Sequence, residues 1–278
     1  MTLEQPTSAG LSVTIPLSLE TEARDLCARR GTSLDGLVTD VLSEYVQCCG
    51  HTMFQTSTAT ALVEGVYSGS ISSSILLKRG NFGLGTFENL DGEMIILDGE
   101  IYQATGDVRR RSDDFPVPFA SVTHFQEGEA FEIGEFASLK EMETACDRYR
   151  ESENLFYALR LDGIFDFAHL RAVHPVPEGT RLVDAASKEL EFHFPEVEGT
   201  LVGLWSPRYS SAFSVPGYHF HFVSKDRSKG GHVLNCAAQR LRASMQIVHE
   251  YHIHFPAAGS FLTADLSRDP TSDLGKAE

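Results

Sequence analysis

The sequence predicts a β-rich α+β body that follows a small N-terminal strand-helix-helix extension. Two observations support this fold class. From His51 onward, apolar segments of strand length alternate with glycine-containing turns, and few segments have the spacing of a helix. Residues 1–50 instead contain one strand-like segment followed by two helix-like segments. We therefore expect an extension at 1–50 and a separate body at 51–278.

The extension is predicted to contain a strand at 11–17 and two helices. The strand segment, LSVTIPL, alternates apolar and polar residues. Ser18 is in position to cap the first helix, which Gly31 should end, and Ser33 is in position to cap the second. One face of the second helix is apolar and consists of Leu34, Leu37, Val38, Val41, Leu42 and Tyr45. This order resembles a ribbon-helix-helix unit, whose strand pairs with a second chain. It predicts either a dimerising appendage or a simple helical hairpin.

Turn and capping motifs divide the body into its expected elements. Asp98-Gly99 and Asp162-Gly163 are each expected to form a two-residue hairpin turn. Ser138 with Glu141 forms a capping box at the start of a helix. The polar tail from Ser267 is expected to be irregular. Further strands are expected at 199–207, 218–224, 232–238 and 244–255.

The composition disfavours some classes of protein. The formal net charge is −16, so a general basic surface for nucleic acid is not expected. The outward positions of the predicted strand, Ser12, Thr14 and Pro16, carry no positive charge, which disfavours a ligand-sensing DNA-binding regulator. Five cysteines without a CxxC pair indicate reduced thiols and a cytoplasmic location. Neither a secretory signal nor a membrane-spanning apolar stretch is expected.

The segment GYHFHFVSKDRSKGGH at 217–232 combines three histidines with a turn. On a strand, His219 and His221 point to one face, and the glycine-rich turn allows His232 to return opposite them. Three neutral imidazoles suit zinc and leave coordination positions open for water or substrate. The ordinary alternative is a hairpin that carries histidines only as polar surface residues.

A second pair with the same spacing, His252 and His254, is the obvious competitor for this role. It lacks a glycine-marked turn with a third histidine beyond it, so we expect a solvated strand face. The other candidate histidines stand alone in the sequence and are expected to be structural; they are His51, His124, His169, His174 and His193.

Several segments together resemble the alpha-acetolactate decarboxylase family. They are residues 54–69, 80–103, 154–163 and 199–203 and, above all, GYHFHFVSKDRSKGGHVL at 217–234. The resemblance runs from residue 54 to roughly residue 266 and leaves the N-terminal extension outside it. It implies an α/β protein built on an extended, two-lobed mixed β-sheet, with a homodimer as the common assembly.

The resemblance also implies a reaction, a cofactor and a set of site residues. Members of the family convert 2-acetolactate to acetoin and carbon dioxide, on the route to butanediol, and they use zinc. His219, His221 and His232 would then hold the metal, which would chelate the hydroxyl and keto oxygens of the substrate and stabilise an enediolate. The same resemblance assigns catalytic roles to four further residues, which are Thr86, Glu93, Arg171 and Glu278.

Some of these residues also have ordinary structural interpretations. Arg171 could be a surface charge at a strand end. Glu93 could be a turn acid beside Gly92, and Glu88 and Glu100 would be equal candidates by spacing alone. A cupin-type metal enzyme is a further alternative, because cupins also place HxH on a β-hairpin. Cupins have a glutamate a few residues after the HxH pair. Here the residues after Phe222 are VSKD, which contain no glutamate. The decarboxylase is therefore the preferred prediction.

Overall fold

The computed structural model describes residues 12–48, 51–187 and 189–277. Contacts within the chain divide it into two compact units, one that ends at Cys48 and one that begins at Cys49. Among the described helices, none is long and apolar enough to cross a membrane.

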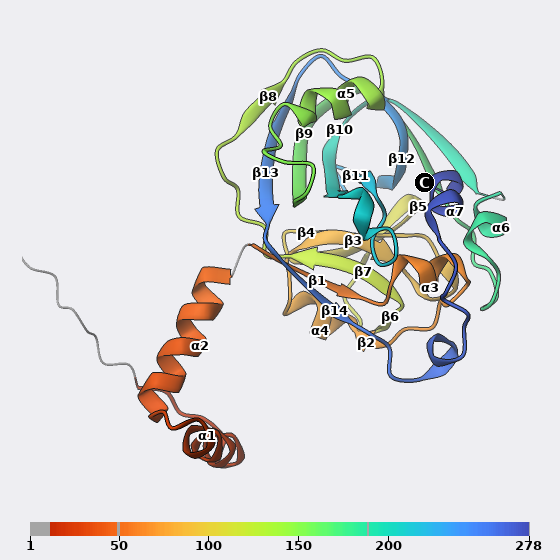
Figure 1. Cartoon of the computed structure of the whole chain (residues 1–278). Coiled ribbons are helices and arrows are strands. Elements are labelled where there is room, and N and C mark those ends of the chain that lie inside the picture. The colour runs from red at the N-terminus through yellow and green to blue at the C-terminus, as the bar shows by residue number, and fades with distance from the viewer. Residues whose placement is uncertain (1–11, 49–50, 188, 278) are drawn as a thin grey trace, which may run out of the picture. The chain divides into compact units, whose positions relative to one another are not determined.

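The N-terminal unit contains two helices, α1 (Leu17–Arg30) and α2 (Leu34–Cys48) (Figure 1). Gly31 ends α1 in the left-handed region, with φ 65°, and its N–H donates to the carbonyl of Cys27, as expected. The hydroxyl of Ser33 accepts from the backbone N–H of Gly36 at 3.0 Å, which confirms the second cap.

Two predictions for this unit are wrong. Ser18 does not cap α1, because the helix begins at Leu17 and Pro16 occupies the N-cap position without a side-chain hydrogen bond. The predicted strand at 11–17 is also not formed, since residues 12–16 belong to no strand and Leu17 is helical. An extended segment needs a partner strand for its backbone groups, and proline removes one of the donors.

The described part of the N-terminal unit has almost no core of its own. Of residues 12–42, only Cys27 is buried. The apolar side chains that remain exposed are Val13, Ile15, Leu17, Leu19, Val38, Val41 and Leu42. A unit of this size needs a further surface to bury such residues.

The body is built on one large, mostly antiparallel sheet, which confirms the β-rich α+β prediction (Figure 1). Among the described residues, twelve strands follow the order β14-β1-β7-β3-β4-β5-β12-β11-β10-β9-β13-β8, and β12 also pairs with β9. Of the pairs that these described strands form, only β1–β14 is parallel. The strands are β1 (Thr52–Thr56), β3 (Phe82–Thr86), β4 (Glu93–Leu97), β5 (Glu100–Arg111), β7 (Phe119–Thr123), β8 (Phe131–Ile133), β9 (Phe156–Ala172), β10 (Leu190–Ser206), β11 (Gly217–Ser224), β12 (Lys229–Ala237), β13 (Leu241–Val248) and β14 (Glu250–His254).

Short elements surround this sheet. The two-stranded pair β2 (Ile71–Ser72) and β6 (Pro116–Val117) stands apart from it. The helices of the body are α3 (Ala59–Val63), α4 (Ser73–Leu77), α5 (Leu139–Asp147), α6 (Leu182–Ala186) and α7 (Thr271–Ala277), with 3-10 turns η1 (Glu88–Leu90), η2 (Arg208–Ser210) and η3 (Gly259–Leu262). The tail from Ser267 is therefore not irregular throughout. Leu274 of α7 is buried, which gives this short helix its contact with the body.

The two Asp-Gly motifs behave differently. Asp98 and Gly99 have φ values of 55° and 78° and join β4 to β5, as the predicted tight hairpin requires. Asp162 and Gly163 instead lie inside the continuous strand β9, so the second predicted hairpin is wrong. A Cβ at Gly163 would lie 2.6 Å from Cδ2 of Leu241, so glycine here allows the close approach of β13.

The segment 244–255, expected to be one strand, is divided between β13 and β14. The division falls at His249, whose N–H donates to the carbonyl of His51 at 2.8 Å. After this point the chain leaves β9 and pairs with β1. The change of partner carries the chain from one end of the sheet order to the other.

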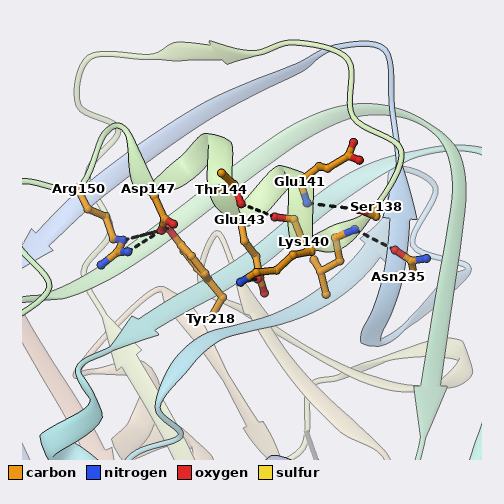
Figure 2. A network of polar contacts seen from close by, with 10 residues as sticks. Ser138, Lys140, Glu141, Glu143, Thr144, Asp147, Arg150, Tyr218 and Asn235 are labelled. Carbon is orange, nitrogen blue, oxygen red and sulfur yellow. Dashed lines mark hydrogen bonds and ion pairs between the residues drawn. The ribbon is translucent and has the colours of Figure 1, made fainter.

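Helix α5 is fixed to the strands that carry the histidine-rich segment. Figure 2 shows the Ser138 hydroxyl accepting from the N–H of Glu141, at 3.3 Å, and Asn235 of β12 accepting from the helix. At the other end of the helix, Tyr218 of β11 donates to Asp147 at 2.9 Å. The predicted cap at Ser138 is thus confirmed, and α5 joins β11 to β12.

Strand β11 presents its aromatic residues to one core and its histidines to the opposite face. Phe220 and Phe222 are buried in a cluster with Phe165 and the apolar face of α5. Glycines at 199 and 203 of β10 make room for these rings, since a Cβ at either position would lie under 2.5 Å from a ring carbon. Alternation along the strand then directs His219 and His221 to the other side.

Candidate metal centre

Three histidines converge where β11 and β12 pair. His221 lies directly opposite His232 in the antiparallel register, as the hairpin prediction required. The Nε2 atom of His219 is 3.1 Å from Nδ1 of His232. One ligand atom from each of the three rings lies within 4.8 Å of the others, so the set has the dimensions of a metal site.

The two ring nitrogens of His221 have different surroundings, and one of them is available to bind a metal. Its Nδ1 lies 2.9 Å from the carbonyl oxygen of Met94, which can only accept, so this nitrogen carries the proton. Its Nε2 therefore presents a lone pair. That atom is buried and makes no hydrogen bond, and the nearest carboxylate oxygen, on Glu93, is 3.4 Å away. A bound cation would satisfy this atom.

The surroundings keep the three imidazoles neutral, which is the form that binds metal. Burial lowers the pKa of His219 to about 3, and the nearby charge of Arg171 acts in the same direction. Burial also lowers the pKa values of His221 and His232 well below the usual range, and the neighbouring histidines and Arg171 add to the effect. No proton then has to be displaced from these ligands at neutral pH.

The polar residues expected from the sequence lie beside this cluster. A cavity of about 40 Å³ is lined by His219, His232, Thr86, Glu93 and Arg171. Two strand pairings bring them together. Thr86 faces Glu93 across β3 and β4, and Arg171 of β9 faces His232 of β12.

Two hydrogen bonds orient the side chains of this cavity. The buried guanidinium of Arg171 donates to Glu189 at 2.5 Å. The hydroxyl of Thr86 donates to the carbonyl of Gly92 at 3.2 Å. Glu189 carries no motif in the sequence and could not have been found there.

The two other glutamates that matched by spacing lie elsewhere. Glu88 accepts from the N–H of Gly69 at 2.9 Å, and Glu100 pairs with Arg110. Neither lines the cavity. Glu278 lies outside the described residues.

The cavity also has an apolar wall. Its members come from α3, η1, β7, α6 and two loops, and they are Leu62, Leu90, Phe119, Val173, Leu182 and Val215. These residues all belong to one buried cluster, which also contains Leu274 of α7. Sequence reasoning missed this wall because no regular spacing connects residues from so many separate elements.

The remaining histidines are placed outside this centre. His252 and His254 lie on β14 at the end of the sheet order, and the His252 side chain is 61% exposed, 3.7 Å from Glu250. Among the five histidines expected to be alone, two are neighbours. His169 and His193 stack with ring centroids 3.8 Å apart and form a second group with Glu191.

Comparison with known proteins supplies a family for this arrangement. The family model described as alpha-acetolactate decarboxylase matches residues 53–268. The alpha-acetolactate decarboxylase of Methanosarcina mazei is 40% identical over 250 residues, covering 88% of this chain and 85% of that protein. The enzyme of the same name from Lactococcus lactis subsp. lactis is 37% identical over 217 residues, covering 77% of this chain and 92% of that protein.

A solved structure agrees with the sequence comparisons. The crystal structure of alpha-acetolactate decarboxylase from Bacillus subtilis superposes with a TM-score of 0.78 at 32% sequence identity. The match covers 82% of this chain and 99% of that one. The region matched by the family model begins at Met53, beyond the N-terminal unit.

Proposed function

This chain belongs to the alpha-acetolactate decarboxylase family of carboxy-lyases, and we propose that it converts 2-acetolactate to acetoin and carbon dioxide with zinc held by His219, His221 and His232. The observation that carries the metal assignment is the buried, unprotonated Nε2 of His221, which has no hydrogen-bond partner. Three neutral imidazoles suit zinc and leave positions open for a substrate.

The charged residues of the cavity then have separate tasks. When bound, zinc would polarise the keto oxygen and stabilise the negative charge that remains on the substrate as carbon dioxide leaves. Arg171 would bind and orient the carboxylate of the substrate, because its guanidinium is buried and is held by a hydrogen bond to Glu189. Glu93 would deliver the proton that replaces carbon dioxide on the reacting carbon.

The remaining wall residues shape the site. The hydroxyl of Thr86 donates its proton to the carbonyl of Gly92. The hydroxyl oxygen of Thr86 would therefore accept a hydrogen bond from a hydroxyl group of the substrate. The apolar wall formed by Leu62, Leu182 and their neighbours would exclude water. Exclusion of water strengthens the interactions of Arg171 and Glu93 with a charged substrate.

We also propose that Glu278 takes part in the reaction. Leu274 of α7 packs in the same buried cluster as Leu62 and Leu182, which line the cavity. The chain just before Glu278 is therefore attached to the wall of the site. Substitution Glu278→Gln should lower kcat while the protein keeps its zinc, and an unchanged kcat would remove this residue from the mechanism.

The test of the reaction is acetoin formation from 2-acetolactate by the purified protein, before and after chelation. Activity should be lost when the metal is removed and should return when zinc is added. The metal content of each sample is measured in parallel, and circular dichroism shows that the chelated protein is still folded. A folded, zinc-loaded protein that forms no acetoin would contradict the proposed function.

For the N-terminal unit, we propose pairing with a second copy of the chain in a homodimer. The support is its exposed apolar surface, since Cys27 is the only buried residue among 12–42 while Val13, Leu17 and Val41 are exposed. Deletion of 1–50 should leave an active enzyme with fewer chains per particle in solution. Val41→Glu should weaken the dimer in the full-length chain, with Thr39→Glu as a control. An unchanged number of chains per particle after deletion would contradict the pairing.

A reducing, cytoplasmic setting is also proposed. Cys27, Cys146 and Cys236 are free and buried. Burial raises the pKa values of Cys146 and Cys236 to about 12, so these thiols stay protonated and unreactive. Labelling of the folded protein with a thiol reagent should therefore be slow at both cysteines and should become fast on unfolding.

A further inference from the structure

A second group of metal-binding side chains lies on the long β9–β10 pair. His169 and His193 are directly opposite each other in the antiparallel register. Glu191 is two residues before His193 and therefore projects from the same face of β10. The three residues are far apart in sequence, and the strand pairing alone brings them together.

The donor atoms are close, and solvent can reach them. The Nε2 atom of His169 lies 2.6 Å from Oε2 of Glu191. The rings of His169 and His193 stack with centroids 3.8 Å apart. One ligand atom from each residue lies within 4.8 Å of the other two. The side chain of Glu191 is 53% exposed and that of His169 is 21% exposed, so an ion can enter without opening the fold.

We propose that His169, Glu191 and His193 form a second, weaker site for a divalent transition-metal ion such as zinc. Two imidazoles and one carboxylate are a common donor set for such ions and leave positions for water. The net charge of −16 raises the local concentration of cations around the protein. The site is distinct from the three-histidine cluster and shares none of its ligands.

Two features make this site weaker than the first. The rings lie only 18° from parallel, so at least one must rotate before both lone pairs point at one ion, and the stacking of the two rings is then lost. A metal ion would also have to displace the contact between Nε2 of His169 and Oε2 of Glu191.

The chain contains a matched control. Glu250, His252 and His254 supply the same three side-chain types, at alternate positions on one face of β14. Among the described residues, the donor atoms of this second set do not all lie within 4.8 Å of one another. A site that depended only on exposed histidine and glutamate would form equally well at both places.

The experiment is a zinc titration by calorimetry of the zinc-loaded holoprotein, prepared without a histidine tag. Wild type should bind one further equivalent of zinc. His193→Asn and Glu191→Gln should each weaken this second event by at least about tenfold, as expected for the loss of one ligand. His252→Asn should leave it unchanged. Acetoin formation should persist in His193→Asn, because His193 does not line the cavity.

Two results would overturn the second site. One is a holoprotein that binds no further zinc. The other is a second event that survives in the double variant His169→Asn and His193→Asn. Failure of the proposed reaction would be seen separately. In that case wild type would form no acetoin but would still bind the further equivalent of zinc that His193→Asn weakens. The first site is followed by the zinc content of the purified holoprotein, which His221→Asn should lower.

Discussion

Two histidine pairs with identical HxH spacing occupy very different places in the sheet. His219 and His221 lie on β11, which has β10 on one side and β12 on the other. His252 and His254 lie on β14, which among the described strands pairs only with β1. Both pairs also have a glutamate within 4 Å, Glu93 at 3.4 Å from His221 and Glu250 at 3.7 Å from His252.

The difference comes from what neighbouring strands add. Beside β11, the partner strand supplies His232, the carbonyl of Met94 fixes one tautomer, and burial lowers the pKa of each ring. Beside β14, the side chain of His252 is mostly exposed, and the described residues supply no third ligand close enough. A local motif therefore becomes a site only when strands distant in sequence complete it.

The largest expected effect separates the two pairs directly. His221→Asn should remove zinc and reduce acetoin formation to background, because it deletes one of the three buried imidazoles proposed to hold the metal. His252→Asn, in the other pair, should change neither the zinc content nor the rate of acetoin formation. Metal analysis and an acetoin assay check both variants. Full zinc content in His221→Asn would show that the metal is held elsewhere.

A second prediction compares the two glutamates. Glu93→Gln should retain zinc and lose about a hundredfold to ten-thousandfold in kcat, which is the usual range for loss of a general acid or base. Glu250→Gln should have wild-type kcat, although Glu250 stands beside a histidine pair in the same way. Full activity in zinc-loaded Glu93→Gln would exclude it from proton transfer.

A smaller effect is expected at the arginine beside the first pair. Arg171→Lys keeps a positive charge but loses the planar set of donors held by Glu189. We expect kcat/KM to fall by about tenfold to a hundredfold, corresponding to about 1.5–3 kcal/mol for a hydrogen bond to a charged group. Arg110→Lys, on an exposed pair with Glu100, is the control. Equal kinetics for Arg171→Lys and wild type would leave Arg171 without a role in orienting the substrate.

The smallest effect concerns stability and pH. In the metal-free protein the folded pKa of His219 is about 3, whereas an unfolded histidine titrates near 6.5. Stability from this residue is complete above about pH 6.5 and is lost as the pH falls toward 3, because the unfolded chain binds the extra proton. Urea midpoints should therefore fall less steeply with acidification in His219→Asn than in wild type. His252→Asn should match wild type, and identical slopes for all three proteins would contradict a depressed pKa.

Local chemistry predicted the parts of the structure that depend on neighbours in sequence. The hairpin that brings His232 opposite His221, the tight turn at Asp98-Gly99 and the cap at Ser138 each follow from a few adjacent residues. The wrong hairpin prediction depends on a distant partner, because Gly163 is a packing position against Leu241 rather than a turn. The wrong cap at Ser18 is a local error, because the helix begins one residue earlier.

The site was predictable only in part for the same reason. The three histidines have a motif, but Glu189 and the apolar wall have none, because α3, α6 and β9 meet only after the sheet has formed. Residues such as Leu62 and Leu182 look like any other apolar residue in the sequence. The second histidine group was missed likewise, since the register of β9 with β10 creates it.

The parallel pairing of β1 with β14 sets an order on biosynthesis. Thr52 and Glu250 are 198 residues apart, so one edge of β1 has no strand partner until almost the whole body has been made. At about 5–20 residues per second, translation needs roughly 10–40 s to supply β14. During that interval β1 can pair only with β7, and its open edge can pair with other nascent chains. Completion of the sheet is consequently a late and slow folding event.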